Sequence, residues 1–178
     1  LRPYVIEDAD AMFRNWANDP QVTKYLSWEP HKDVEETKQI LEGWIKSYES
    51  KDFYTWAIAR KEDEGNVIGS ISVPQLNQKA GRVTVGYCLG RNWWGHKIMK
   101  EAFAELIRFF FEVEGANRVE ALHDTHNVNS GKVMAACGLK KEGTLRRYGW
   151  NNQGICDECI YGMVASDYFE GKQRWENK

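Results

Sequence analysis

Long apolar segments are absent from this sequence of 178 residues. A membrane-spanning helix needs ~20 consecutive apolar residues, whereas even the burst Phe109-Phe110-Phe111 stands between Arg108 and Glu112. A signal-peptide pattern is also missing, so we expect a cytoplasmic protein with no membrane partner. Because the sequence begins at Leu1 rather than Met, we expect that a few residues precede it.

Cysteine is scarce, and its spacing does not predict a metal site. The four cysteines are Cys88, Cys137, Cys156 and Cys159, and the four histidines show no zinc-ligand spacing with them. The last two cysteines form a C-x-x-C inside 155–164, which reads as a strand. Residues three apart in a strand point to opposite faces, so these thiols are poorly placed to chelate or cross-link. We expect reduced, structural cysteines and no bound metal.

The sequence also lacks an excess of basic residues. Its formal net charge of −2 argues against nucleic acid as the main partner. With 42% hydrophobic and 28% charged residues, the composition is typical of a globular protein. The length fits one domain spanning residues 1–178. Basic side chains do gather locally, at Arg91, His96, Lys97 and Lys100.

Hydrophobic periodicity predicts helices and strands in a mixed order. The expected helices are 8–18, 33–48, 95–114 and 127–137, and the expected strands are 53–60, 67–73, 81–89, 118–123, 140–148 and 155–164. Pro20 should end the first helix, Asp33 and Glu36 have capping-box spacing, and Asn127 should cap the last helix. The buried stripe of the third helix should include Val113. This order predicts a mixed sheet flanked by helices.

The most informative stretch, 85–102, combines a strand, a turn with two glycines and a helix whose first turn is basic. The start of a helix carries free backbone N–H groups and the positive end of the macrodipole, and it therefore suits a phosphate group. Gly90 and Gly95 have the spacing of a P-loop, but that motif needs Lys and then Ser or Thr directly after the second glycine. His96, Lys97 and Ile98 follow instead, which excludes a P-loop.

This stretch resembles the acetyl-CoA-binding motif of the GNAT acetyltransferase superfamily. It is most similar to the branch that contains ribosomal-protein N-terminal alanine and serine acetyltransferases. The matching residues are Gly86, Tyr87, Trp94, Gly95, Glu101 and Ala102. Asn92 stands in place of the usual Gln or Arg, and Lys97 replaces the second glycine of the motif. Lys97 keeps its backbone N–H but crowds the turn, so the affinity for the cofactor is the property it affects.

A second segment, 127–139, resembles the family's Asn-x-x-Ser and short helix, which line the pantetheine and thiol end of the cofactor. Asn127 and Ser130 occupy the motif positions, while Ala136 and Leu139 depart from the usual Lys and Phe. Matches in 15–26 and 142–161 extend the resemblance over nearly the whole chain. It implies an α/β fold of the GNAT type, with a mostly antiparallel sheet of about six or seven strands.

The resemblance also implies roles for individual residues. Ser130 is the expected donor to the departing sulfur, and the backbone N–H groups of Cys88 and Leu89 are expected to stabilise the oxyanion. The expected cofactor-binding residues are Tyr87, Cys88, Leu89, Arg91, Trp94, Gly95, His96, Lys97, Ile98, Met99, Asn127, Ser130 and Lys132. No covalent intermediate is needed, so the Cys88 thiol need not be a nucleophile.

The acceptor side is less specific in the sequence. Trp16, Tyr25 and Trp28 lie in the family's acceptor region, although such aromatic residues are often part of the core. The general base stays open among Asp124, His126 and Asp157, because Thr84 stands where some relatives carry Glu. We expect acetyl transfer from acetyl-CoA to a protein N-terminus, such as that of a ribosomal protein, by direct attack. A homodimer is a further hypothesis, since the sequence does not determine the oligomeric state. The alternatives are acetylation of a small amine or antibiotic, a non-catalytic acyl-CoA-binding module, and a purely structural interaction domain.

Overall fold

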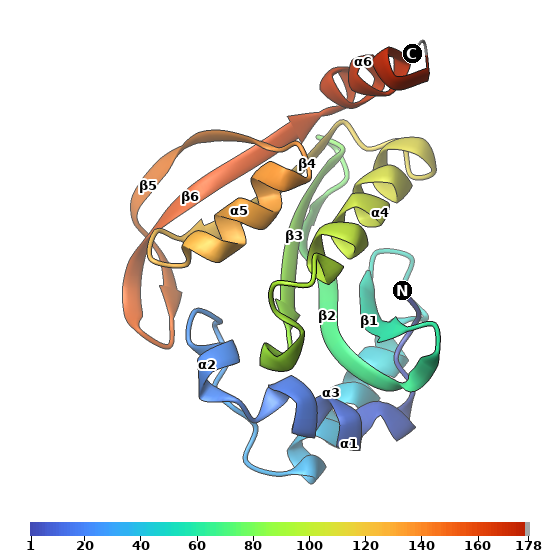
Figure 1. The fold of residues 1–178 in the computed structure, drawn as a ribbon, viewed down its shortest axis with the longest axis vertical. Coiled ribbons are helices and arrows are strands. Elements are labelled where there is room, and N and C mark those ends of the chain that lie inside the picture. The colour runs from blue at the N-terminus through green and yellow to red at the C-terminus, as the bar shows by residue number, and fades with distance from the viewer. Residues whose placement is uncertain (177–178) are drawn as a thin grey trace.

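The computed structural model describes residues 1–176, which form a six-stranded sheet with helices on both faces (Figure 1). The strands are β1 (Thr55–Arg60), β2 (Asp63–Asn77), β3 (Arg82–Leu89), β4 (Arg118–Asp124), β5 (Lys140–Asn151) and β6 (Gly154–Val164), in the order β1-β2-β3-β4-β6-β5. Only the β3–β4 pair within these residues is parallel. The mixed, mostly antiparallel sheet expected from the sequence is therefore confirmed.

The helices form two layers, each with its own apolar core. The first layer consists of η1 (Ile6–Asp8), α1 (Ala9–Met12), the π-helical turn η2 (Phe13–Ala17), α2 (Pro20–Thr23) and α3 (Val34–Ser47). It buries Met12, Trp16 and Leu41 against Ala57 and Val67 of the sheet. The second layer contains the short turn η3 (Arg91–Trp93), α4 (Ile98–Glu112) and α5 (Val128–Ala136). A last helix, α6 (Ala165–Glu176), follows β6 at the far end of the sheet (Figure 1).

The second core is built largely from one face of α4. Apolar residues recur along this helix every three or four positions, so they share the side that faces the sheet. Phe103, Leu106 and Phe110 are almost fully buried there. They pack with the central strands β3 and β4, and burial of each side chain stabilises the fold by roughly 1.5–3 kcal/mol. The position of the N-terminal end of α4 is therefore fixed by its own core.

Two predicted helix ends differ from the observed ones. Pro20 does not simply end the first helix, because it is the first residue of α2, where a missing backbone N–H has no cost. Asp19 caps this helix by accepting a hydrogen bond from the Gln21 N–H at 2.9 Å. Val113 is 62% exposed rather than buried, since α4 ends one residue earlier.

The predicted caps of the other helices are only partly present. Asp33 accepts a hydrogen bond from the Glu36 N–H, but the Glu36 carboxylate accepts from the Lys32 N–H and so does not complete the capping box. The Asn127 side chain makes no capping hydrogen bond to α5. The sequence analysis also missed α6.

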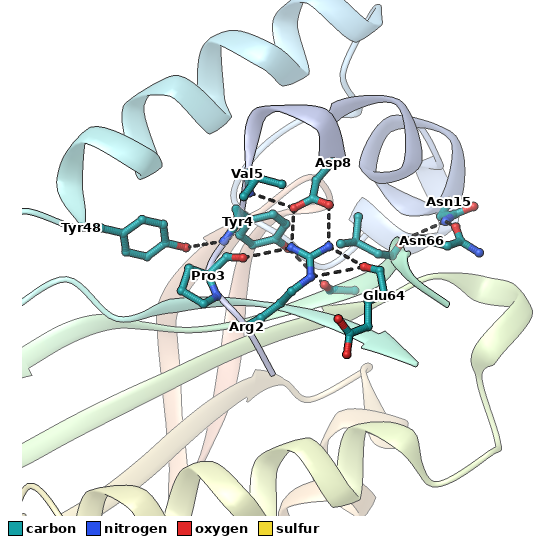
Figure 2. Close-up of polar contacts among 11 residues, drawn as sticks. Arg2, Pro3, Tyr4, Val5, Asp8, Asn15, Tyr48, Glu64 and Asn66 are labelled. Atoms are coloured by element: carbon teal, nitrogen blue, oxygen red, sulfur yellow. Dashed lines mark hydrogen bonds and ion pairs between the residues drawn. The ribbon is translucent and has the colours of Figure 1, made fainter. Parts of the chain in front are cut away.

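A polar cluster joins the N-terminal segment to the sheet (Figure 2). Arg2 donates two hydrogen bonds of 2.7 Å to the Asp8 carboxylate, which is 2% exposed. Nearby, the Asn15 side chain donates to Asn66 Oδ1 and to the Val67 carbonyl. Because a buried charge that loses its partner is strongly destabilising, these contacts fix the first helical layer on β1 and β2.

Candidate functional site

The two parallel strands separate before they end. Their pairing runs from Arg82–Arg118 to Val85–Ala121 and stops there, while β3 continues for four residues and β4 for three. β3 stays paired with β2 as far as Leu89, and β4 stays paired with β6 as far as Asp124. We call the diverging segments, residues 86–89 and 122–124, the splay. Backbone groups that face into the splay have no strand partner.

The hydrogen bonds of β3 determine which amides face into the splay. The Gly90 N–H donates to the Ile68 carbonyl of β2 at 2.8 Å. Because paired residues alternate along an antiparallel ladder, the Cys88 amide also faces β2, and the Tyr87 and Leu89 amides face away from it. The Leu89 carbonyl fits this arrangement, since it accepts a hydrogen bond from the Trp94 indole at 2.7 Å. The sequence analysis expected the backbone amides of Cys88 and Leu89 to stabilise the oxyanion. The Leu89 amide faces the splay, but the Cys88 amide does not, and the Tyr87 amide faces the splay in addition.

The Cys88 thiol faces the first helical layer. It packs against the core that contains Met12, Trp16 and Val67. Burial raises the pKa of the Cys88 thiol to about 12, even though a hydrogen bond to the Ser70 backbone acts in the opposite direction. A protonated thiol is a poor nucleophile, so the structure agrees with a reaction that does not use this cysteine.

The turn after β3 presents backbone amides at an uncapped helix end. Gly95 has φ +80° and Lys97, the residue before α4, has φ 63°. No side chain caps α4, and the first bond of its ladder runs from the Glu101 N–H to the Lys97 carbonyl. The three amides between these residues have no acceptor within the helix. Most of the turn is exposed, so an anion can approach these amides from solvent.

Lys97 is strained where the family pattern has glycine. A left-handed backbone costs a non-glycine residue ~1–2 kcal/mol. We therefore predict that Lys97→Gly will raise the free energy of unfolding by about 1 kcal/mol, part of the relief being offset by the greater freedom of glycine when unfolded. Urea unfolding will measure the change. Lys100→Gly, inside the right-handed helix, is the matched control and should lower stability by about 1 kcal/mol. A less stable Lys97→Gly variant would contradict this account.

The basic residues around the turn differ in whether their charge is already paired. Arg91 Nε lies 3.0 Å from Asp19 Oδ2, so its charge is already paired. His96, Lys97 and Lys100 are exposed. A polar hollow of about 320 Å³ adjoins the turn on the side of the N-terminal helices and is lined by Arg14, Asn15, Asn18, Asp19, Pro20, Arg91 and Asn92.

A pair of hydroxyl groups joins β3 to α5 across the splay. Ser130 Oγ donates to the Tyr87 hydroxyl at 2.9 Å, and the Tyr87 hydroxyl donates to the Ser130 carbonyl at 3.0 Å. Burial raises the pKa of Tyr87, while its bond to Ser130 acts in the opposite direction, so the phenol stays protonated at neutral pH. The sequence indicated Ser130 as the proton donor and Tyr87 only as a cofactor-binding residue, because the two lie 43 residues apart and their hydrogen bond forms only in the fold.

Two carboxylates lie opposite each other on β4 and β6. Asp124 and Glu158 are paired in register, so their side chains share one face of the sheet. Burial acts to raise the pKa of Asp124. Hydrogen bonds from the His126 backbone, the Asn151 side chain and the His126 ring outweigh burial, and the pKa is lowered. Asp124 is therefore ionised, and its oxygens already accept hydrogen bonds, so it has a structural role and is poorly placed to act as the general base.

Glu158 differs from Asp124 in both bonding and charge. Burial, and then repulsion from Asp124, raise the pKa of Glu158. Its carboxylate has no hydrogen-bond donor among the side chains of residues 1–172 or the backbone of residues 1–176, and it lies over Gly149, where no side chain intervenes. The sequence analysis missed Glu158, because its position opposite Asp124 depends on the register between β4 and β6, which appears only in the fold. Of the three bases considered there, Asp157 accepts from the Arg147 N–H, and His126 is exposed beside Asp124.

The other predicted residues are spread over core and surface. Trp16 is 1% exposed, so its side chain lies in the core and does not reach the surface. Trp28 packs edge-on against it at 5.9 Å, and Tyr25 lies half-buried in the same loop. Met99 is a core side chain that offers only its backbone, Ile98 and Asn127 are half-buried, and Lys132 is exposed.

Some general properties also follow from the coordinates. All four cysteines are free thiols. Among residues 1–176, none of the helices combines the length and the apolar character that crossing a bilayer requires.

Comparison with known proteins gives consistent matches. The sequence profile described as an acetyltransferase (GNAT) domain matches residues 1–140. An uncharacterized N-acetyltransferase p20 of Bacillus licheniformis is 32% identical, with 94% of this chain and 93% of that protein covered. The [ribosomal protein uS5]-alanine N-acetyltransferase of Escherichia coli (strain K12) is 24% identical over 82% of this chain and 77% of its own.

A solved structure agrees with these sequence matches. The crystal structure of a putative acetyltransferase from T. thermophilus has a TM-score of 0.80 at 29% identity and covers 98% of this chain and 90% of its own. The family profile covers well over half of the sequence, and the splay and the uncapped helix are where the resemblance placed the cofactor. The chain therefore belongs to the GNAT family and is an acetyl-CoA-dependent N-acetyltransferase.

Proposed function

We propose that this enzyme acetylates the α-amino group of a protein N-terminus; one of its relatives is named a [ribosomal protein uS5]-alanine N-acetyltransferase. The observation that carries the proposal is the strength of the available base. An α-amino group has a reference pKa of about 8 and a lysine side chain about 10.4. Burial and the charge of Asp124 raise the pKa of Glu158, but a carboxylate is still a weak base. It is therefore better matched to the α-amino group, the more acidic of the two amines.

The residues of the splay and the turn fit acetyl-CoA. The diphosphate would be held by the free amides at the start of α4, and Gly95 leaves open space there, because a Cβ added to it would meet nothing within 4 Å. The pantetheine would extend toward the unpaired amides of Tyr87 and Leu89. When bound, acetyl-CoA supplies an acetyl thioester as the group to be transferred.

In this proposal the Leu89 N–H stabilises the negative charge that develops on the thioester oxygen. A preorganised backbone donor of this kind contributes roughly 2.7–4 kcal/mol to lowering a barrier. Glu158 accepts the proton that the ammonium form of the acceptor must lose before its nitrogen attacks. Burial, and then the charge of Asp124, raise the pKa of this carboxylate above its ordinary value.

Ser130 and Tyr87 would pass a proton to the departing thiolate, and the second proton that the attacking nitrogen loses on becoming an amide would restore the hydroxyl pair. We predict that Ser130→Ala will lower kcat by about 100-fold, a typical contribution of general acid catalysis. Coenzyme A affinity should change by less than about threefold, since the backbone groups remain. Steady-state kinetics and a coenzyme A titration will separate the two effects, with Asn129→Ala, an exposed neighbour on α5, as the control. Equal turnover of Ser130→Ala and the parent would remove this role.

The acceptor can be identified by a direct assay. The protein is incubated with acetyl-CoA and peptides beginning with Ser, Ala or Thr, and release of free thiol is followed. Peptides with a blocked N-terminus and one internal lysine, together with small amines, are the comparison set. We expect turnover on the free N-termini, whereas turnover on small amines alone would contradict the proposal. A melting-temperature shift with coenzyme A but no turnover would instead indicate a non-catalytic acyl-CoA-binding module.

A further inference from the structure

Asn152, at the tip of the β5–β6 hairpin, binds a distant loop through all three of its N–H donors. Its backbone N–H donates to the Leu26 carbonyl at 3.1 Å. Its side-chain amide donates to the carbonyls of Thr23 at 2.9 Å and Trp28 at 2.7 Å. The loop after α2 is therefore wrapped around one side chain that lies more than 120 positions later in the sequence.

The hairpin tip has internal hydrogen bonds of its own and is also bonded to the site. Asn152 and Gln153 form the turn between the paired residues Asn151 and Gly154, and Gly154 has a positive φ of +98°, which glycine adopts at little cost. The side-chain oxygen of Asn151 accepts a hydrogen bond from the Gln153 N–H. The side-chain amide of the same residue donates to Asp124 Oδ2 at 2.7 Å. Because Asp124 faces Glu158, a single chain of contacts links Asn152 to the proposed base.

The same segment is fixed at its other end and along its length. We call residues 19–28 the strap. Asp19 caps α2 and also pairs with Arg91 of the cofactor turn at 3.0 Å. In the loop, the Trp28 ring packs against Trp16 and, at 5.3 Å, against His31. The strap thus runs from the turn at the end of β3 to the hairpin tip, below the end of the sheet at which β3 and β4 diverge (Figure 1).

We propose that Asn152 is a positioning residue that holds the strap in place and thereby limits the size of the first acceptor residue that can reach Glu158. This inference rests on the proposed N-terminal acetylation. A larger first side chain needs space near the base, and an outward movement of the strap at this end breaks the three hydrogen bonds to Asn152. The favoured acceptors are then chains that begin with a small residue such as Ala or Ser.

Acceptor selectivity provides the test. Peptides that differ only in beginning with Ala or Phe are compared in the parent, in Asn152→Ala and in Asn152→Asp. We expect the parent to favour Ala, and both variants to reduce the Ala-to-Phe ratio of kcat/KM by about tenfold, the effect of losing one or two hydrogen bonds. The KM for acetyl-CoA should stay unchanged, because the turn at Gly95 is not touched. Gln153→Ala, in the same turn but with hydrogen bonds only to Asn151 and Asn152, is the control and should keep the parental ratio.

Trypsin cleavage after Lys24 tests the strap without any turnover. Cleavage should be slow in the parent and in Gln153→Ala, and at least about tenfold faster in Asn152→Ala, because local opening exposes the chain. A parent that uses Ala and Phe peptides equally well would overturn the size limit while leaving acetyl transfer intact. Absence of turnover on every peptide would instead refute the proposed function, and unchanged cleavage at Lys24 would refute the role of Asn152 by itself.

Discussion

Gly95→Glu will lower the affinity of this enzyme for coenzyme A by at least ~100-fold. A carboxylate and a phosphate ~5 Å apart repel each other by ~3 kcal/mol at an effective dielectric constant of ~20, and high salt will reduce the effect. The new side chain would also occupy the space that is open at Gly95 in the structure. Calorimetric titration with coenzyme A at low and physiological salt will measure the loss.

The control for this variant lies at the other end of the same helix. Gly115 also has a positive φ, +66° against +80° at Gly95, and a Cβ added there would likewise meet nothing within 4 Å. Gly115→Glu therefore introduces similar backbone strain and the same charge, but far from the turn. We expect it to bind coenzyme A like the parent. Tight binding by Gly95→Glu would show that the diphosphate is held elsewhere.

The elements around this turn could be predicted from the sequence because their signals are local. The apolar residues of α4 recur with helical period and share one partner, the sheet, so the helix and most of its buried face were evident. Val113 was assigned wrongly because the periodicity continues past Glu112 while the helix does not. Pro20 was misread for a related reason, since the same residue can follow one helix and begin the next.

Most of the site could not be predicted, because its residues meet only in the folded chain. Nothing near Ser130 indicates that its hydroxyl binds Tyr87, and nothing near Asn152 indicates the loop at Thr23. The direction of the Leu89 amide depends on the register between β3 and β2, which two separate strands determine together. The motif in residues 85–102 predicted where in the chain the splay lies, whereas tertiary contacts determine how each group is oriented within it.

The two carboxylates illustrate how position on the sheet separates the roles of similar groups. Asp124 and Glu158 are direct cross-strand neighbours. Three hydrogen bonds from His126 and Asn151 keep Asp124 charged, whereas Glu158 has burial and the charge of Asp124 acting against its ionisation. Environments that push two pKa values apart are typical of acid–base sites. We therefore expect Glu158, which accepts no bond within the described chain, to be the group that exchanges protons.

Glu158→Gln will lower kcat/KM for the peptide acceptor by at least ~100-fold, because an amide of the same shape cannot accept the proton. Coenzyme A affinity and the melting temperature should remain close to those of the parent. Asp157→Asn is the matched control, since it alters the neighbouring carboxylate, which is bonded to the Arg147 N–H. Parental turnover in Glu158→Gln would rule out the residue as the base.

The pH profile gives an independent measure of the same residue. A base works only when it is deprotonated, so kcat/KM should fall as the pH drops through the pKa of Glu158, which lies above its ordinary value. Asp124→Asn removes the repelling charge, so the pKa of Glu158 should decrease and the acid limb should move to lower pH. A different acceptor should leave the acid limb at the same pH, because this limb reports the pKa of an enzyme residue and not of the acceptor. An acid limb that does not respond to Asp124→Asn would mean that another group accepts the proton.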